Sequence, residues 1–330
     1  MRAYIIRRIL LIIPTLILVS IIVFLTVRLI PGSLIDQLAG EMVEPGGLTK
    51  EEIAQQIRED LGLDAPIYIQ YLRWVGVWPQ KDGSFAGILE GNLGESLRTR
   101  RPILGEIVSK IPISLELGII AIITGLLIAF PIGIYSAIRQ DSIGDYAGRS
   151  IAILFMAIPG FWLATMIWVF PSKWWSWSPS PVYIPITENF IGNLGQFIIP
   201  GILMGMVMSG VTMRMTRTMM LEVLRQDYIR TAWSKGLRER VVVVRHALKN
   251  AMIPVITIIG LQLPVLIGGT VIMEQIFNLP GMGRYMIDSL GARDYSIISG
   301  INVMMATVIL LANLLVDLTY AWLDPRIRYR

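Results

Sequence analysis

Residues 9–30 read ILLIIPTLILVSIIVFLTVRLI, and Arg28 is the only charged side chain in this stretch. An α-helix rises about 1.5 Å per residue, so about 20 apolar residues cross the roughly 30 Å hydrocarbon layer of a membrane. Arg2, Arg7 and Arg8 precede the stretch, as in a signal peptide. It is longer than a signal core and ends without a small-residue cleavage pattern, so we expect a retained first membrane span.

Further apolar stretches of spanning length follow along the chain. They are residues 115–137, 151–170, 198–211 with a more polar continuation, 252–273 and 298–318. The 330 residues are 54% hydrophobic and 16% charged, with a mean hydropathy of +0.62, which is more apolar surface than one soluble core buries. The sequence therefore predicts an all-α polytopic membrane bundle of six transmembrane helices.

The basic residues predict the orientation of these spans. Arginine and lysine are dense at the N-terminus, in the short loop with Arg139 and Arg149, in residues 214–249, and in the tail with Arg326, Arg328 and Arg330. Positive loops face the cytoplasm. We expect both termini in the cytoplasm and the chain in the cell (inner or plasma) membrane.

The long polar segment between the first two spans is expected outside the membrane as a small folded subdomain. Residues 49–52 read TKEE, a capping-box pattern, and Ile53, Ile57 and Leu61 follow at helical spacing before Gly62 ends the helix. Asp64 and Pro66 begin a second short helix. The predicted division is residues 1–30 for the cytoplasmic end and first span, 31–112 for the extracytoplasmic subdomain, and 113–330 for the membrane core with spans two to six.

Composition excludes several kinds of chemistry. The chain has no cysteine and one histidine, His246, so thiol catalysis and histidine metal clusters are excluded. No Gly-x-x-x-x-Gly-Lys-Ser/Thr phosphate loop is present, and no nucleophile or acid–base pair stands out. We predict a chain that is not an enzyme and holds no metal or cofactor. The net charge of +5 lies beside apolar segments, so it fits membrane orientation better than nucleic-acid binding.

Residues 222–250 form a basic loop between the fourth and fifth spans. Tyr228–Lys235 have the length of about two helical turns, and Gly236 can adopt the left-handed conformation that turns the chain back. Small Thr231 and Ala232 permit close approach by a partner surface. The pattern indicates a short docking helix on the membrane face, and a basic helix touching anionic lipid is the alternative.

A series of short patterns follows along the chain: Arg7-Arg8 with RLIPG at 28–32, GNLGES at 91–96 with RPI at 101–103, IPGFWL at 158–163, MLEVLRQDY at 220–228, NLLVD at 313–317 and LDPRIRY at 323–329. In this order they resemble, nearly end to end, the dipeptide/oligopeptide/nickel permease family of binding-protein-dependent ABC importers. It implies a type I-like importer permease. A secondary carrier or a membrane scaffold would not need the glycine-punctuated basic loop.

In that family the loop is the EAA loop, whose helix seats in a groove of the ATPase subunit. The residues implied in coupling are Asp227, Tyr228, Arg230, Thr231, Ala232, Trp233, Lys235 and Gly236. Arg230 and Thr231 replace the Glu and first Ala of the name-giving pattern, and Trp233 is bulkier than expected. The implied partners are a second permease, identical or homologous, two ABC ATPase subunits that bind ATP and Mg, and an extracytoplasmic substrate-binding protein. Dipeptides, oligopeptides, nickel chelates, glutathione and sugars all stay open as substrates.

Residues 274–283, EQIFNLPGMG, follow the fifth span and resemble a family motif. Pro280 and Gly281 favour a tight non-helical turn, while Glu274 and Phe277 are candidates for gate or substrate contacts. Met208 belongs to a methionine-rich fourth span, which fits either a permissive passage or ordinary helix packing. Trp174, Trp175 and Trp177 are expected to form an interfacial aromatic belt.

Overall fold

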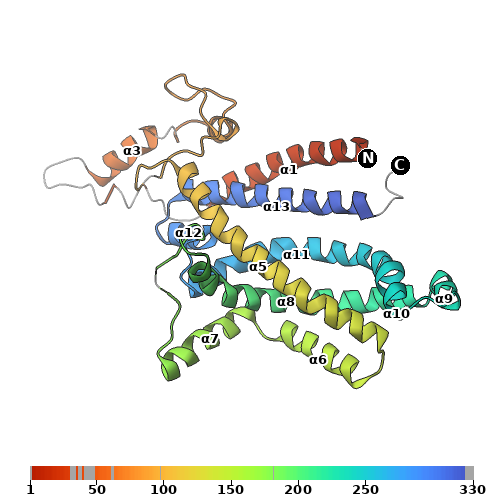
Figure 1. The fold of residues 1–330 in the computed structure, drawn as a ribbon. Coiled ribbons are helices and arrows are strands. Elements are labelled where there is room, and N and C mark those ends of the chain that lie inside the picture. Colours follow the sequence, from red (N-terminus) through yellow and green to blue (C-terminus); the bar gives the residue numbers. More distant parts are fainter. Residues whose placement is uncertain are drawn as a thin grey trace. The chain divides into compact units, whose positions relative to one another are not determined.

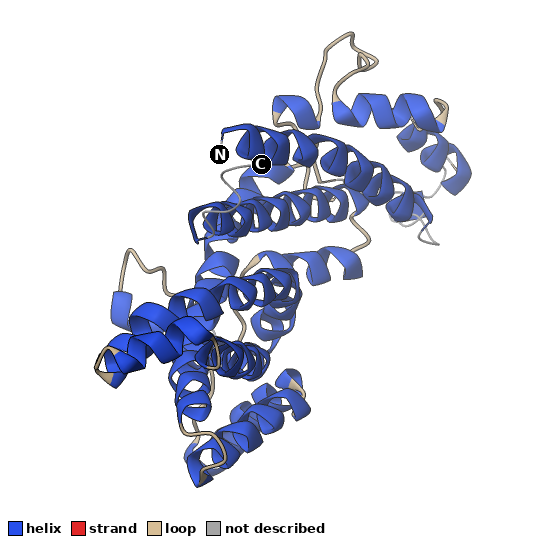
Figure 2. Ribbon diagram, turned by 90° about the vertical axis from the view of Figure 1, so that its right-hand side faces the viewer, coloured by secondary structure: helices blue, strands red, loops and turns tan. Residues whose placement is uncertain are grey.

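The structure is a computed structural model that describes residues 2–29, 35, 39–40, 49–60, 63–96, 98–180 and 182–323. Over these residues it consists of helices and loops, without a strand (Figure 2). The chain divides into two compact units. Unit 1 holds residues 1–9, 112–284 and 309–330, and unit 2 holds residues 10–111 and 285–308. Pro31, Gly32, Gly62 and residues 324–330, on which some predictions fell, lie outside the described residues.

The long helices account for the predicted spans (Figure 1). Among the described residues, five helices are long and apolar enough to cross a membrane. They are α1 (Arg2–Leu29), α5 (Ile103–Ile138), α8 (Phe190–Leu224), the continuous run of α10 (Glu239–Val241), η2 (Val242–Leu248) and α11 (Lys249–Ile276), and α13 (Tyr295–Leu323). The pair α6 (Ile143–Ala157) and α7 (Gly160–Trp175) makes six if it is counted as one span.

The predicted third span, residues 151–170, is not one straight helix. α6 and α7 meet at 87°, with Ile158 and Pro159 in extended conformations between them. A proline disfavours helical geometry in the residue before it, which explains a break at this position. The continuous apolar run concealed this break in the sequence.

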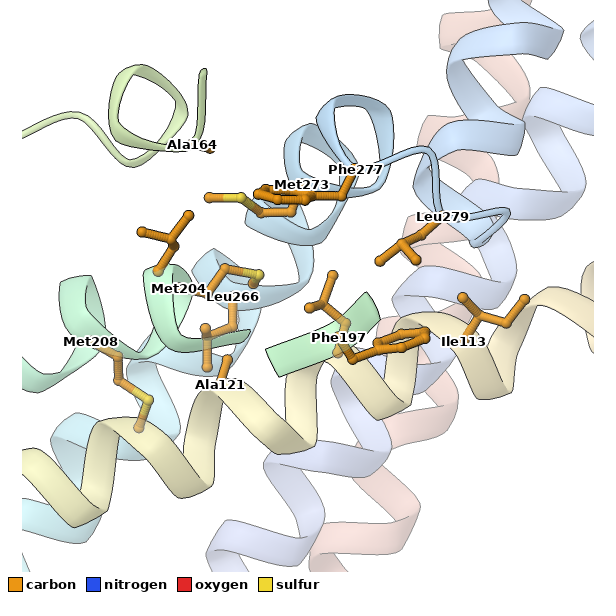
Figure 3. Packing of buried hydrophobic residues seen from close by; sticks show 12 residues of the cluster. Ile113, Ala121, Ala164, Phe197, Met204, Met208, Leu266, Met273, Phe277 and Leu279 are labelled. Carbon is orange, nitrogen blue, oxygen red and sulfur yellow. The ribbon is translucent and has the colours of Figure 1, made fainter. Parts of the chain in front are cut away.

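The core of unit 1 is formed where α5, α7, α8 and α11 pack together (Figure 3). Its buried residues are Ile113, Leu117, Ala121, Ala164, Phe197, Leu203, Met204, Met208, Leu266, Met273, Phe277 and Leu279. A Cβ added to Gly205 would lie 2.7 Å from the carbonyl oxygen of Ala121, and one added to Gly201 would meet Ile120. These two glycines therefore allow α8 to approach α5 closely, as the small-x-x-x-small pattern predicts.

Unit 2 contains the short helices α3 (Lys50–Asp60), α4 (Ile67–Val75) and η1 (Ile88–Glu90). The predicted capping box is confirmed: the Thr49 backbone N–H donates to the Glu52 carboxylate over 2.7 Å, and the Glu52 N–H donates back to the Thr49 hydroxyl. Ile53 and Ala54 of this helix are buried in a small cluster. Gly76 ends α4 in the left-handed conformation.

The segment with the GNLGES pattern packs against the start of α13 within unit 2. The Ser96 hydroxyl donates to Asp294 over 2.6 Å, and Asp294 in turn accepts from the backbone N–H of Ile297. In the same unit Tyr285, on α12 (Met282–Gly291), donates its hydroxyl to Glu106. Burial and this carboxylate raise the pKa of Tyr285 above its ordinary range, so the phenol keeps its proton.

Candidate functional site: an exposed helix between two long helices

α9 (Asp227–Ser234) follows α8 after a tight turn and stands beside α10 in unit 1 (Figure 1). Gln226 is extended and is the N-cap residue of α9, and Asp227 lies in the first turn of α9, where a carboxylate interacts favourably with the helix dipole. Gly236 has a φ of +73°, and its N–H donates to the carbonyl of Trp233. The sequence therefore predicted the short helix and its left-handed glycine correctly.

The inner face of α9 is packed against its own protein. Ile229 and Ala232 are 0% and 6% exposed and belong to a cluster with Ala137, Met220, Val242, Val243, Ala247 and Ala251. These residues come from the ends of α5 and α8 and from the η2–α11 segment. Ala232 therefore lies on the inner face, because a helix in contact with a core turns one face inward, and its contact with a partner stays a prediction.

The outer face of α9 carries the remaining side chains. The exposed residues are Asp227, Tyr228, Arg230, Thr231, Trp233, Ser234, Lys235 and Gly236. Trp233 is 45% exposed, which is unusual for a large apolar ring. Arg230 pairs with Asp227 over 3.4 Å, but both are largely exposed, so the pair adds little stability. This face combines tryptophan with arginine, two of the residue types most enriched in protein interfaces.

Two polar contacts fasten this region further. The Asn250 side-chain amide donates to the Tyr228 hydroxyl over 2.8 Å, which joins α9 to the start of α11. Arg139, just after α5, pairs with Glu239 of α10 over 3.2 Å. α9 is thus held by its buried face and by the hydrogen bond between Asn250 and Tyr228. Because packed interiors deform little, a displacement of α9 would be transmitted to α5, α8 and α11.

Sequence reasoning missed the π-helix η2, which joins α10 to α11. A signal for it was present, since the buried residues Val243, Ala247, Ala251 and Val255 recur at steps of four. An α-helix has 3.6 residues per turn, so steps of four drift around its axis. The wider turn of the π-helix at the start of this segment keeps the four residues on one side of it. π-Helical segments are also frequent at functional sites.

The role of Asp145 at the start of α6 was likewise not predicted from the sequence. Its carboxylate is completely buried and accepts two hydrogen bonds of 2.7 Å from the Arg217 guanidinium of α8, with Arg149 a further 3.5 Å contact. Breaking one side of such a buried pair costs roughly 3–5 kcal/mol. The local signal was Ser142 three residues earlier, whose hydroxyl caps this helix by accepting from the Asp145 N–H.

At the other end of α11, Glu274 organises the predicted turn. Its side chain is completely buried and accepts from the Ser114 hydroxyl over 2.6 Å and from the backbone N–H of Arg284 over 2.9 Å. The Ser114 oxygen also accepts from the Met282 N–H over 2.9 Å. A Cβ on Gly281 would lie 2.4 Å from the carboxylate, so glycine is required there.

The other candidates for gate or pathway residues are also enclosed. Phe277 points into the core beside Met273, and Met208 points from α8 toward α5 (Figure 3). Pro280 is partly buried in the same turn. The geometry supports a structural role for Glu274 and Phe277 and a packing role for Met208. Trp174, Trp175 and Trp177 are exposed, as interfacial rings would be.

Within the described part of the chain, no group of three His, Cys, Asp or Glu side chains is placed to hold a metal ion. What the structure does define is a multi-pass membrane protein that presents an anchored, aromatic and basic helix between two of its long helices.

Comparison with known proteins gives the family. A family model described as binding-protein-dependent transport system inner membrane component matches residues 129–329, and the model of its N-terminal region matches residues 1–118. The dipeptide transport system permease protein DppB of Escherichia coli (strain K12) is 38% identical, and that of Alkalihalophilus pseudofirmus is 40% identical, each over the full length of both chains. A crystal structure of an amino acid ABC transporter with histidines is 14% identical with a TM-score of 0.49, over 66% of this chain and 94% of that one.

The chain therefore belongs to the family of inner membrane components of binding-protein-dependent transport systems. It is a multi-pass permease subunit of the ABC importer class, a non-catalytic membrane component. The expected family and the all-α membrane fold are confirmed.

Proposed function

We propose that this chain is one of two permease subunits in an ATP-driven importer of dipeptides or similarly small peptides. The proposed coupling to the ATPase subunits rests on the outer face of α9, where Arg230, Trp233 and the C-cap residue Lys235 are exposed. The inner face of the same helix is packed into a core. The names of the relatives, which are dipeptide transport permeases, support the substrate class.

In this proposal α9 seats on an ATPase subunit that binds ATP and Mg. Closure of the two ATPase subunits pushes α9, and the shared buried cluster carries that movement into α5, α8 and α11. The second permease supplies the other half of the pathway, and an extracytoplasmic binding protein delivers the peptide. Both termini are cytoplasmic, in keeping with the distribution of basic residues, and residues 31–112, which follow the first span, then form the extracytoplasmic subdomain.

The coupling role is tested on the outer face of α9, since a change at Ala232 would disturb the core instead. Arg230→Glu and Trp233→Ala should each lower the affinity of the purified permease pair for its ATPase subunits at least about tenfold, as expected for interface arginine and tryptophan. Arg101→Glu is the matched control, because Arg101 is an exposed arginine of the other compact unit. Unchanged ATPase binding in both α9 variants would refute the coupling role.

The substrate is tested separately. Proteoliposomes that contain the assembled importer and its binding protein should take up a labelled dipeptide when ATP is supplied, and unlabelled small peptides should compete. Uptake that only nickel chelates, glutathione or sugars inhibit would contradict the peptide assignment while leaving the coupling role intact.

A further inference from the structure

Helix α4 of unit 2 has an unusual composition for a helix outside a core. Its sequence is IYIQYLRWV, and Gln70 and Arg73 are its two polar residues besides the tyrosines. None of its residues is buried by the protein. Its first residues, Ile67 and Tyr68, are exposed, and an apolar helix face that no core covers suits the interface of a membrane.

The polar groups of α4 are directed to the protein. The Gln70 amide nitrogen donates to the carbonyls of Leu63 and Ala65, and its oxygen accepts from Arg28 over 2.8 Å. The Nε of Arg73 donates to the carbonyl of Pro79. These bonds reduce the need of α4 for water as a hydrogen-bonding partner.

α4 lies along the last turns of the membrane helix α1. The Tyr71 hydroxyl is 2.8 Å from the Ser20 hydroxyl, and the Phe24 ring lies 5.3 Å from Tyr71 and 5.5 Å from Trp74 between centroids. Phe24 is almost completely buried by these contacts. The contacts place α4 beside the membrane span and not beyond its end.

The length of α1 determines how deep in the membrane its contacts with α4 lie. Ser20 precedes Arg28, the end of the candidate span Ile6–Arg28, by about 12 Å at 1.5 Å per residue. If α4 stood in water above the membrane, Ser20 and Phe24 would stand there too. The remaining residues 6–19 would measure roughly 21 Å, which is too short for a hydrocarbon layer of about 30 Å.

We propose that α4 and the turn after it lie in the interfacial layer of the bilayer, as a membrane-anchored helix that holds the subdomain to the lipid surface. With the orientation proposed above, this is the outer leaflet. The outward residues of this surface are Ile67, Tyr68, Val77 and Trp78, all exposed. Tyrosine and tryptophan favour the headgroup level, and α1, which α4 contacts, also exposes the apolar residues Leu18, Ile22 and Leu25.

The following loop supplies the contrast. Lys81, Asp82 and Ser84 are exposed, and Asp82 caps a polar turn by accepting from the Ser84 N–H and hydroxyl. Such a loop is costly to bury in hydrocarbon. Tyr68 and Val77 should therefore contact lipid while Ser84 contacts water.

The absence of native cysteine makes a direct test possible. Tyr68→Cys, Val77→Cys and the control Ser84→Cys are each labelled with a nitroxide in the full permease pair, reconstituted in phosphatidylethanolamine–phosphatidylglycerol nanodiscs. Collisions with oxygen, which concentrates in lipid, and with a water-soluble nickel chelate are then compared. We expect the ratio of oxygen to nickel collisions to be several-fold higher at positions 68 and 77 than at 84.

Two results would overturn the proposal. Equal nickel collisions at all three sites would place α4 in water, and exclusion of both reagents at 68 and 77 would show that a protein covers it. The assignment of α4 to the outer leaflet rests on the proposed orientation of the chain and is tested separately. A membrane-impermeant maleimide should label Ser84→Cys in intact cells. Labelling only after lysis would overturn the outer-leaflet assignment and that orientation, while the depth result would still hold.

Discussion

The two ends of the α11 segment use polar residues in opposite ways. At the Ile276 end, the Glu274 carboxylate accepts hydrogen bonds from the Ser114 hydroxyl and from the Arg284 N–H inside the protein. At the Lys249 end, α9 turns Ile229 and Ala232 inward and leaves its charged side chains in solvent. Both ends carry family motifs, but only the second presents a surface.

This difference separates a structural motif from a contact motif. A buried carboxylate with its hydrogen bonds satisfied fixes a turn and has no free capacity for a ligand. An exposed aromatic ring and cations on a rigid helix favour binding to a partner, because the backbone is already ordered before binding and loses little further entropy. The same comparison predicts where substitutions will damage folding and where they will damage assembly.

The largest effect is expected from Glu274→Ala. The change leaves the Ser114 hydroxyl and the Arg284 N–H without their acceptor, and each such group costs about 1–3 kcal/mol when buried. Because both groups are only partly buried, we expect the free energy of unfolding to fall by about 2–4 kcal/mol. Thermal unfolding of the purified protein in detergent measures this.

Gln275→Ala is the matched control, since Gln275 is the exposed neighbour of Glu274 and its loss should shift stability little. A Glu274→Ala protein that melts like the wild type but no longer transports would show that the carboxylate is a gate or substrate contact.

Gly281→Ala should have the next largest effect. The added methyl would meet the Glu274 carboxylate at 2.4 Å, so either the turn or the carboxylate must shift, and overpacking of this kind costs about 1–3 kcal/mol. Gly291→Ala is the control, because a Cβ there meets nothing within 4 Å. Equal melting temperatures for the two variants would mean that the turn is looser than the structure indicates.

The sequence predicted well those features that depend on neighbouring residues. Thr49 and Glu52 specify a helix start, and Gly236 specifies a left-handed helix end, because each acts through contacts a few residues away. The apolar runs likewise predicted most spans, since the thickness of lipid sets their length. Local chemistry was sufficient in these cases.

Features that depend on distant residues were missed. Asp145 and Arg217 are 72 positions apart, and nothing in either segment specifies their contact. The inward direction of Ala232 depends on where α5 and η2 pack, so the periodicity of α9 alone did not give it. The break at Pro159 was visible as a proline, but the apolar run around it outweighed that signal in the prediction of a span.

The smallest effect is expected from Tyr228→Phe, which tests whether Tyr228 belongs to the inner or the outer set of α9. Its hydroxyl accepts from Asn250, whose amide also donates to the His246 carbonyl over 3.3 Å, so the amide keeps a partner when the hydroxyl is lost. We expect a loss of stability of about 0.5–1.5 kcal/mol, the net value of one hydrogen bond, and unchanged affinity for the ATPase subunits. A double-mutant cycle with Asn250→Ala isolates the bond, because the two changes should not add if the bond is their shared contribution. The opposite result, unchanged stability with weakened ATPase binding, would move Tyr228 to the contact surface, and the anchoring of α9 would then depend on Ile229 and Ala232 alone.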